Sequence, residues 1–148
     1  METTVLMQLK DLGAAGALAL AAVGSGLGAG VAGMAAVGAW KKCFAQNKAA
    51  PFMLIAFVGA PLSQTIYGMI LMNKIVESSA QGSFSWGMGI LGGLAMGVSA
   101  WMQGKAGAGA SDALAETGKG IANYLMVLGI IETVALFVLV FMLGKVGA

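Results

Sequence analysis

Long apolar stretches alternate with short polar connections along this chain. Four of the stretches are long enough to cross the roughly 30 Å hydrocarbon core of a bilayer as helices. They cover about residues 12–40, 52–73, 84–110 and 121–144. We therefore predict an all-α membrane protein with four transmembrane helices arranged as two fused helical hairpins. Residues 1–80 form the first hairpin (helices about 12–40 and 52–73), and residues 81–148 the second (helices about 84–113 and 121–144).

The composition supports a membrane protein and excludes several other classes. Apolar residues make up 59% of the 148 residues, charged residues only 9%, and the mean hydropathy is +0.89, outside the range of ordinary soluble domains. One cysteine, Cys43, allows no internal disulfide, and a chain without histidine cannot build a zinc site from its remaining ligand types. A net charge of +2 with no arginine makes no case for nucleic-acid binding.

The lysines predict an orientation. The connections between the first and second and between the third and fourth predicted helices hold five of the eight lysines. Lysine-rich loops stay in the cytoplasm, so we expect these two connections to be cytoplasmic and both termini to lie outside. The first stretch lacks a basic leader and is longer than the apolar part of a signal peptide. We expect it to remain in the mature chain.

The first and third predicted helices are rich in glycine and alanine, whereas the second and fourth are rich in bulky apolar residues. This order suggests a duplicated hairpin. An offset of 74 residues aligns Ser25 with Ser99, and an offset of 68 aligns Gln64 with Glu132. Small residues let membrane helices approach closely. Narrow and broad helices in alternation predict the inner and outer layers of a ring of copies.

Glu132 is the single acid in the middle of a predicted span, with eleven residues of the helix on each side. A charge at the bilayer centre costs about 2.5–3.5 kcal/mol on insertion scales, so such a residue is usually neutralised by a proton, a cation or a buried partner. We therefore predict that Glu132 binds a cation or a proton.

Few other polar side chains occur within the spans. Gln64 and Tyr67 are three residues apart and share a helix face. Pro61 removes an amide donor and crowds the carbonyl of Phe57, so we expect a break there that frees a carbonyl for an ion. Other polar residues within the spans include Ser63, Thr65, Ser99, Gln103, Asn123, Tyr124 and Thr133.

These groups bear on the nature of the ion. A hard cation such as Na⁺ takes several oxygen ligands, and a carboxylate, two amides, a hydroxyl and a freed carbonyl would supply them. A proton needs only the carboxylate, although amides can also hold a protonated carboxyl. The amides favour Na⁺, and H⁺ stays the alternative. Gln64 and Gln103 also suit interhelical hydrogen bonds, worth about 0.6–2 kcal/mol in membranes.

Depth links the second and fourth helices. At 1.5 Å per residue, Glu132 lies about 18 Å from Gly144 and Gln64 about 14 Å from Asn73 on the same side of the membrane. Gln103 lies about 28 Å from that side, so it reaches Glu132 only if its helix protrudes or shifts along its axis.

The glycine-rich hairpins, the carboxylate in the fourth helix and the run Ala-Pro-Leu-Ser-Gln-Thr-Ile-Tyr-Gly at residues 60–68 resemble the rotor proteolipid of bacterial V-type ATPases, also called the K or c subunit. The likeness covers essentially the whole chain. The Pro-x-x-Gln-x-x-Tyr pattern resembles the sodium-transporting branch of that family.

The resemblance implies a set of roles at the site. Glu132 would be the ion-binding carboxylate and Tyr67 the hydroxyl that steadies it, with Thr133 and Pro61 as supporting residues. The implied ligands to Na⁺ are Glu132, Gln64, Gln103, Ser63 and the backbone carbonyl of Ala60. Ser63 replaces a threonine of sodium-binding relatives and Leu62 a glycine, and the loss of the threonine methyl suggests weaker sodium affinity.

The resemblance also implies partners and a place in the cell. About ten copies would form a cyclic rotor ring in the lipid of a bacterial cell membrane, coupled through central-stalk subunits to an ATP-hydrolysing head. A stator subunit would supply the arginine that releases the ion, because this chain has none. The chain would not be an enzyme on its own and needs no organic cofactor. Gln64 in place of a second carboxylate leaves one ion per four helices, which favours an ATP-driven pump.

Three other interpretations are weaker. A small multidrug antiporter also has four short helices, but its carboxylate lies in the first helix, whereas residues 12–40 carry no charge here. A purely structural ring predicts that Glu132→Gln keeps activity. The glycine spacing at residues 28–33 fits a dinucleotide fingerprint, but no strand precedes it.

Overall fold

In the computed structural model, residues 2–147 are described, apart from the side chains of Glu2, Thr3, Leu6 and Lys10. Met1 and Ala148, the outer limits of the two predicted hairpins, and the Lys10 side chain used for the orientation lie outside the described part. Over residues 2–147 the chain is helical, with no strand. Its elements are α1 (Glu2–Ala45), α2 (Leu54–Gly59), the 3₁₀ turn η1 (Ala60–Leu62), α3 (Ser63–Ala80), α4 (Trp86–Thr117) and α5 (Ile121–Leu143).

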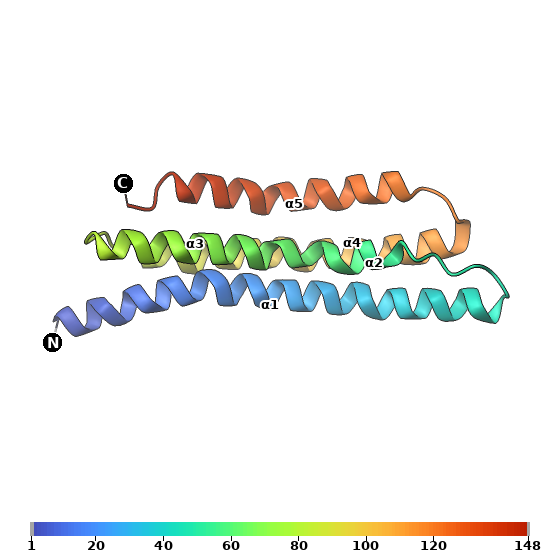
Figure 1. Ribbon diagram of the computed structural model, residues 1–148, viewed down its shortest axis with the longest axis horizontal. Helices are drawn as coiled ribbons and strands as arrows, with labels where there is room; N and C mark the ends of the chain where they lie inside the picture. The colour runs from blue at the N-terminus through green and yellow to red at the C-terminus, as the bar shows by residue number, and fades with distance from the viewer. Residues whose placement is uncertain (1, 148) are drawn as a thin grey trace.

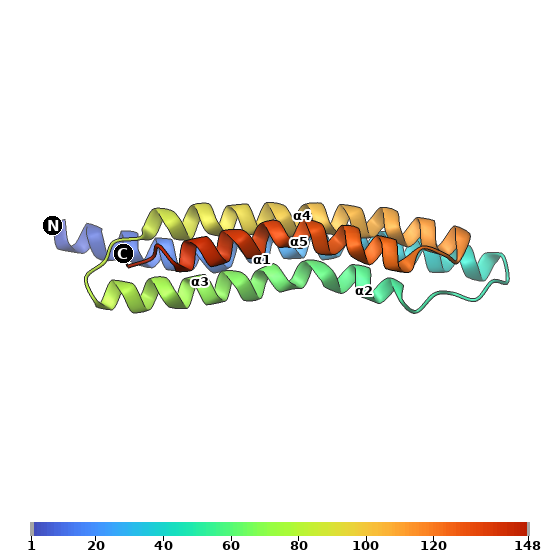
Figure 2. The same cartoon turned by 90° about the horizontal axis from the view of Figure 1, so that it is seen from above.

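The elements form four nearly parallel rods, because α2, η1 and α3 together make one rod (Figure 1). Helices α1 and α5 lie on opposite sides of the bundle in Figure 1, and α3 and α4 lie on opposite sides in the perpendicular view of Figure 2, so each pair is diagonal across the bundle. Both termini and the connection between α3 and α4 lie at one end of the bundle, and the other two connections lie at the opposite end. The predicted all-α fold of two hairpins is therefore confirmed.

Three segments within residues 2–147 are long and apolar enough to cross a membrane: Met7–Ala45, Leu54–Ala80 and Ile121–Leu143. The sequence predicted a fourth over 84–113. Helix α4 occupies that place with 32 residues, but it is not among the three. The glycines of α4 contribute little hydropathy, and the helix also carries the polar residues Gln103, Lys105 and Asp112. The helix is instead covered by its neighbours, with fourteen buried residues from Gly89 to Ala115.

The helix ends differ from the predicted ones mainly in α1 and α3. Helix α1 continues to Ala45 and ends before Asn47, which has a positive φ of 52°. Helix α3 continues seven residues beyond the predicted end at Asn73, and Lys74 pairs with Glu77 within it. Polar residues near these ends lower the local hydropathy, but none of them breaks a helix. The helices therefore extend beyond the apolar stretches.

Helices α1 and α4 meet along glycines. A Cβ added to Gly24 would overlap the backbone of Gly97, and one added to Gly104 would overlap the backbone of Gly28. Without side chains between them, the two backbones approach to van der Waals contact, as small residues allow in membrane helices. At the end of this contact the Lys42 ammonium lies 2.7 Å from the Glu116 carboxylate, and that hydrogen bond holds the pKa of Glu116 below its usual range.

Two apolar clusters fill the bundle, one toward each end. The first is centred on Leu71, Ile75, Met96 and Ala135, and the second on Leu54, Phe57, Ala110 and Leu128. Between them two polar side chains, Gln64 and Gln103, are completely buried. The apolar core is therefore interrupted by one polar layer.

The glycine contact predicts the outcome of a matched pair of substitutions. Gly104→Ala should destabilise the detergent-solubilised protein by roughly 1–3 kcal/mol, the usual cost of overpacking, because the new methyl meets the Gly28 backbone. Gly26→Ala, where nothing lies within 4 Å, should keep or slightly raise stability, since alanine is the better helix former by about 1 kcal/mol. Thermal unfolding followed by circular dichroism measures both, and equal effects would contradict this packing.

Candidate functional site

The polar layer begins at the break in the second rod. Pro61 lacks an amide hydrogen, so the chain tightens into η1, where the Ser63 amide donates to the Ala60 carbonyl. The predicted break at Pro61 is confirmed. The Ser63 hydroxyl lies 3.1 Å from both the Ala60 carbonyl and Gln64 Oε1, and its single hydrogen is shared between these two acceptors. The Phe57 carbonyl, which loses its donor at Pro61, lies against Gly107, where an added Cβ would come within 2.9 Å.

From Ser63 a chain of hydrogen bonds runs to Glu132 through two glutamines. The Ser63 hydroxyl donates to Gln64 Oε1 at 3.1 Å, and Gln64 Nε2 donates to Gln103 Oε1 at 2.9 Å. Gln103 Nε2 in turn donates to Glu132 Oε2 at 3.3 Å. Three helices, α3, α4 and α5, thus contribute to one connected network at a single depth.

Tyr67 completes the surroundings of the carboxylate. Its hydroxyl donates to Glu132 Oε1 at 2.7 Å, the usual length of a hydrogen bond between a hydroxyl and an oxygen. Tyr67 lies one helical turn after Gln64 in α3, so both side chains lie on one face of that helix, where Gln64 meets α4 and Tyr67 meets α5. Each carboxylate oxygen of the half-buried Glu132 therefore has one donor.

Gln103 reaches this network because α4 extends beyond α5. It lies about 25 Å from the start of α4 at Trp86, whereas Glu132 lies about 17 Å from the end of α5 at Leu143. An added Cβ on Gly92 would lie 3.3 Å from Met142 Sδ, which fixes the relative position of the two helices. Helix α4 therefore protrudes past the end of α5, as the reach of Gln103 required.

Thr133 is the one predicted site residue outside the network. Its hydroxyl donates to the Ile130 carbonyl of its own helix at 2.6 Å, and the residue is exposed. Successive residues of an α-helix point about 100° apart, so Thr133 cannot face α3 and α4 together with Glu132. The supporting role of Thr133 at the site stays a prediction.

Ser99 had no predicted role, yet its hydroxyl donates to the Ile131 carbonyl at 2.9 Å. Gln103, one turn later in α4, donates to the Leu128 carbonyl at 3.0 Å. Two side chains of α4 thus bind two carbonyls of α5, both in the helical turn that precedes Glu132. The four-residue spacing of Ser99 and Gln103 was the signal that would have revealed this pair.

Chemically, the network offers one carboxylate and several neutral oxygens. Within residues 2–147 no group of three or more His, Cys, Asp or Glu side chains gathers to hold a metal ion. A cation at Glu132 would therefore be a hard ion of low charge with mostly neutral oxygen ligands. Gln64, Gln103, Ser63 and the Ala60 carbonyl are the oxygens within this network.

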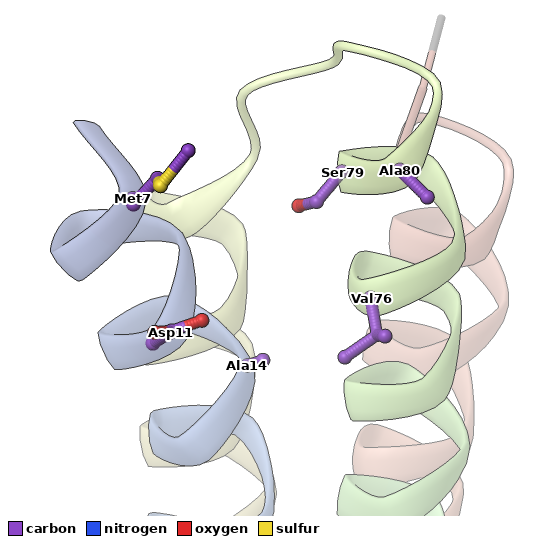
Figure 3. A pocket seen from close by; sticks show the side chains of 6 residues that line it. All are labelled: Met7, Asp11, Ala14, Val76, Ser79 and Ala80. Carbon is purple, nitrogen blue, oxygen red and sulfur yellow. The ribbon is translucent and has the colours of Figure 1, made fainter. Parts of the chain in front are cut away.

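A second polar feature lies far from this network. A cavity of about 350 Å³ opens between α1 and α3 at the end that holds the termini, with Asp11 and Ser79 pointing toward each other across it (Figure 3). Among the described lining residues Asp11 is the charged one and Ser79 the other polar one, and the rest are Met7, Ala14, Val76 and Ala80. The cavity lacks the amides and the tyrosine that surround Glu132.

Comparison with known proteins matches the second hairpin to a family. The family model of the ATP synthase C subunit matches residues 86–143, which cover α4 and α5 and include Ser99, Gln103 and Glu132. No curated protein matches the chain. The family comprises non-catalytic membrane rotor proteins that form oligomeric rings with other ATPase subunits. The chain is thus similar to this family over its second hairpin, and its apolar helices support a multi-pass membrane protein.

Proposed function

We propose that this chain is the rotor proteolipid of a bacterial V-type ATPase and that each copy carries one Na⁺ on Glu132. The observation that carries the proposal is the continuous chain of oxygen-bearing groups from Ala60 to Glu132. Proton binding would need only the carboxylate and one partner. Two completely buried amides belong to this network, and a cation can take amide oxygens as ligands.

Binding requires the two amides to turn. Both Nε2 groups now point along the chain toward the carboxylate, which suits an ionised Glu132. A cation between Glu132 and Gln103 needs the Gln103 oxygen in that place. If Gln103 turns, its nitrogen faces Gln64, which must then present its own oxygen. Tyr67 continues to donate to the far carboxylate oxygen throughout, so Glu132 stays oriented.

A neutral ion–carboxylate pair removes most of the cost of moving Glu132 through lipid. A ring of copies then carries the ion between two access paths as it turns. Release needs a competing positive group, and the chain holds no arginine. A stator subunit with an arginine would supply it, and stalk subunits would couple the ring to ATP hydrolysis. One carboxylate per four helices favours operation as a pump. We place the loops 46–53 and 118–120 in the cytoplasm and the termini outside.

Proton transport by the same residues is the second candidate, because Tyr67 and the two amides can also hold a protonated carboxyl. A hydrophobic carbodiimide reacts with the protonated carboxyl of Glu132. The Na⁺ and H⁺ hypotheses predict different protection of Glu132 from this reagent. We expect Na⁺ at neutral pH to slow labelling of the purified protein, whereas K⁺ should not. Glu132→Gln should remove the labelling, which identifies the reactive residue. Labelling that responds to pH but never to Na⁺ would favour the proton.

Ser63→Thr should strengthen Na⁺ protection. The added methyl restricts the hydroxyl to fewer rotamers, and selecting one of three wells is worth at most about threefold in affinity. The Na⁺ concentration for half-protection should fall roughly two- to threefold. The matched control is Thr133→Ser, because Thr133 lies outside the network. This substitution should leave the Na⁺ concentration for half-protection unchanged. If Ser63→Thr instead raises the Na⁺ concentration for half-protection, the Ser63 hydroxyl is not a ligand.

Tyr67→Phe should leave the fold intact and speed labelling of Glu132 in the absence of Na⁺. The substitution removes the 2.7 Å hydrogen bond to Oε1, so the carboxylate gains freedom to reach the reagent. Tyr124→Phe is the control, because that ring packs against Phe57 at the far end of α5. The same labelling rate in both variants would show that Tyr67 does not restrain the carboxylate.

A further inference from the structure

Helix α5 carries the functional carboxylate but has little apolar packing to hold it in place. Its buried side chains are Leu128, Ala135 and Leu139, and bulky residues such as Ile130, Val134 and Phe137 are more than half exposed. In lipid an apolar side chain gains little by turning inward. The rotation of α5 about its own axis must therefore be set by more directional contacts.

A small rotation would be enough to disrupt the site. The carboxylate of a helical glutamate lies about 6 Å from the helix axis, given the 2.3 Å radius of the Cα atoms. A turn of about 20° therefore moves it by about 2 Å. That displacement breaks a 2.7 Å hydrogen bond to Tyr67 and carries the carboxylate away from Gln103.

Two polar contacts oppose such a rotation through the α5 backbone. Gln103 binds the Leu128 carbonyl, and Ser99 binds the carbonyl of Ile131, the residue next to Glu132. Gln103 also belongs to the ligand network, so its carbonyl contact changes whenever its amide turns. Ser99 touches no member of the network, which leaves it as the contact that persists.

The alternative for a buried helical serine is to bond its own helix. Ser111, also in α4 and completely buried, does so by donating to the Gly107 carbonyl at 2.9 Å. Ser25, the counterpart of Ser99 in the first hairpin, is 2% exposed and has no hydrogen-bond partner within residues 2–147. A crossing hydroxyl bond between the helices of a hairpin is thus found at Ser99, in the hairpin that holds the carboxylate.

From these contacts we infer that Ser99 is a positioning residue for ion binding: its hydrogen bond to the Ile131 carbonyl fixes the rotation of α5 and thereby holds Glu132 between Tyr67 and Gln103. The inference rests on the proposed function for the identity of the ion but not for the position of the carboxylate. Alanine would pack as closely against α5 as serine does. The hydroxyl is therefore needed for the bond and not for the fit.

The test compares isosteric substitutions in the purified protein. Ser99→Thr keeps the hydroxyl and Ser99→Val replaces it with a methyl, so any cost of the added methyl is common to both. We expect Ser99→Val and Ser99→Ala to raise the Na⁺ concentration for half-protection of Glu132 about five- to tenfold and to shift the pH profile of labelling. Ser99→Thr should stay close to the unaltered protein.

Ser111→Ala is the control, because it removes an equally buried hydroxyl from the same helix. It should lower thermal stability at most slightly and leave both labelling profiles unchanged. Equal profiles for Ser99→Thr and Ser99→Val, or an equal shift in Ser111→Ala, would overturn the inference. If Na⁺ fails to protect the unaltered protein, the proposed ion is wrong, whereas the pH profiles of the variants still decide the role of Ser99.

Discussion

The arrangement of this protein depends on the need to hold one carboxylate at mid-membrane depth. Lipid offers Glu132 no hydrogen bonds, so its charge must be balanced by the protein or by a bound ion. One neighbouring helix cannot do this, because a single rod presents one face. The bundle instead brings Tyr67 from α3 and Gln103 from α4 to the two oxygens of Glu132 on α5. The polar layer between the two apolar clusters follows from that requirement.

The glycines of α1 and α4 also contribute to the polar layer, because they let these two helices pack closely beside it. Backbone contact between Gly28 and Gly104 holds α4 close to α1 just beyond Gln103. Gly28 also leaves room for Pro61, since an added Cβ would lie 3.0 Å from the proline Cβ. The same glycine thus admits both α4 and the break in the second rod. The absence of a side chain at Gly28 therefore allows both the close packing of the α1 and α4 backbones and the position of the hydrogen-bonded glutamines.

Much of this was predictable from the sequence, and the residues show why. Glu132 stands out because hydropathy makes an isolated acid conspicuous, and Pro61 predicts a break because its missing amide acts locally. That Gln64 and Glu132 belong to one network followed from their similar depth in the membrane. The position of Gln103 did not, since it depends on how far α4 protrudes past α5, and apolar patterns do not define helix ends. The contact of Ser99 with the Ile131 carbonyl and the outward direction of Thr133 were not foreseen, because a nearly all-apolar helix has no amphipathic pattern that reveals side-chain direction.

The central claim is that one Na⁺ binds per chain and that Glu132 is required for it. The most direct measurement is equilibrium binding of radioactive Na⁺ to the purified protein, with the protein quantified by amino-acid analysis and the pH varied. The account predicts saturation at one Na⁺ per chain, competition by protons, and no saturable binding to Glu132→Gln. Two ions per chain, or undiminished binding to Glu132→Gln, would contradict it, and so would the absence of saturable binding to the unaltered protein at every pH.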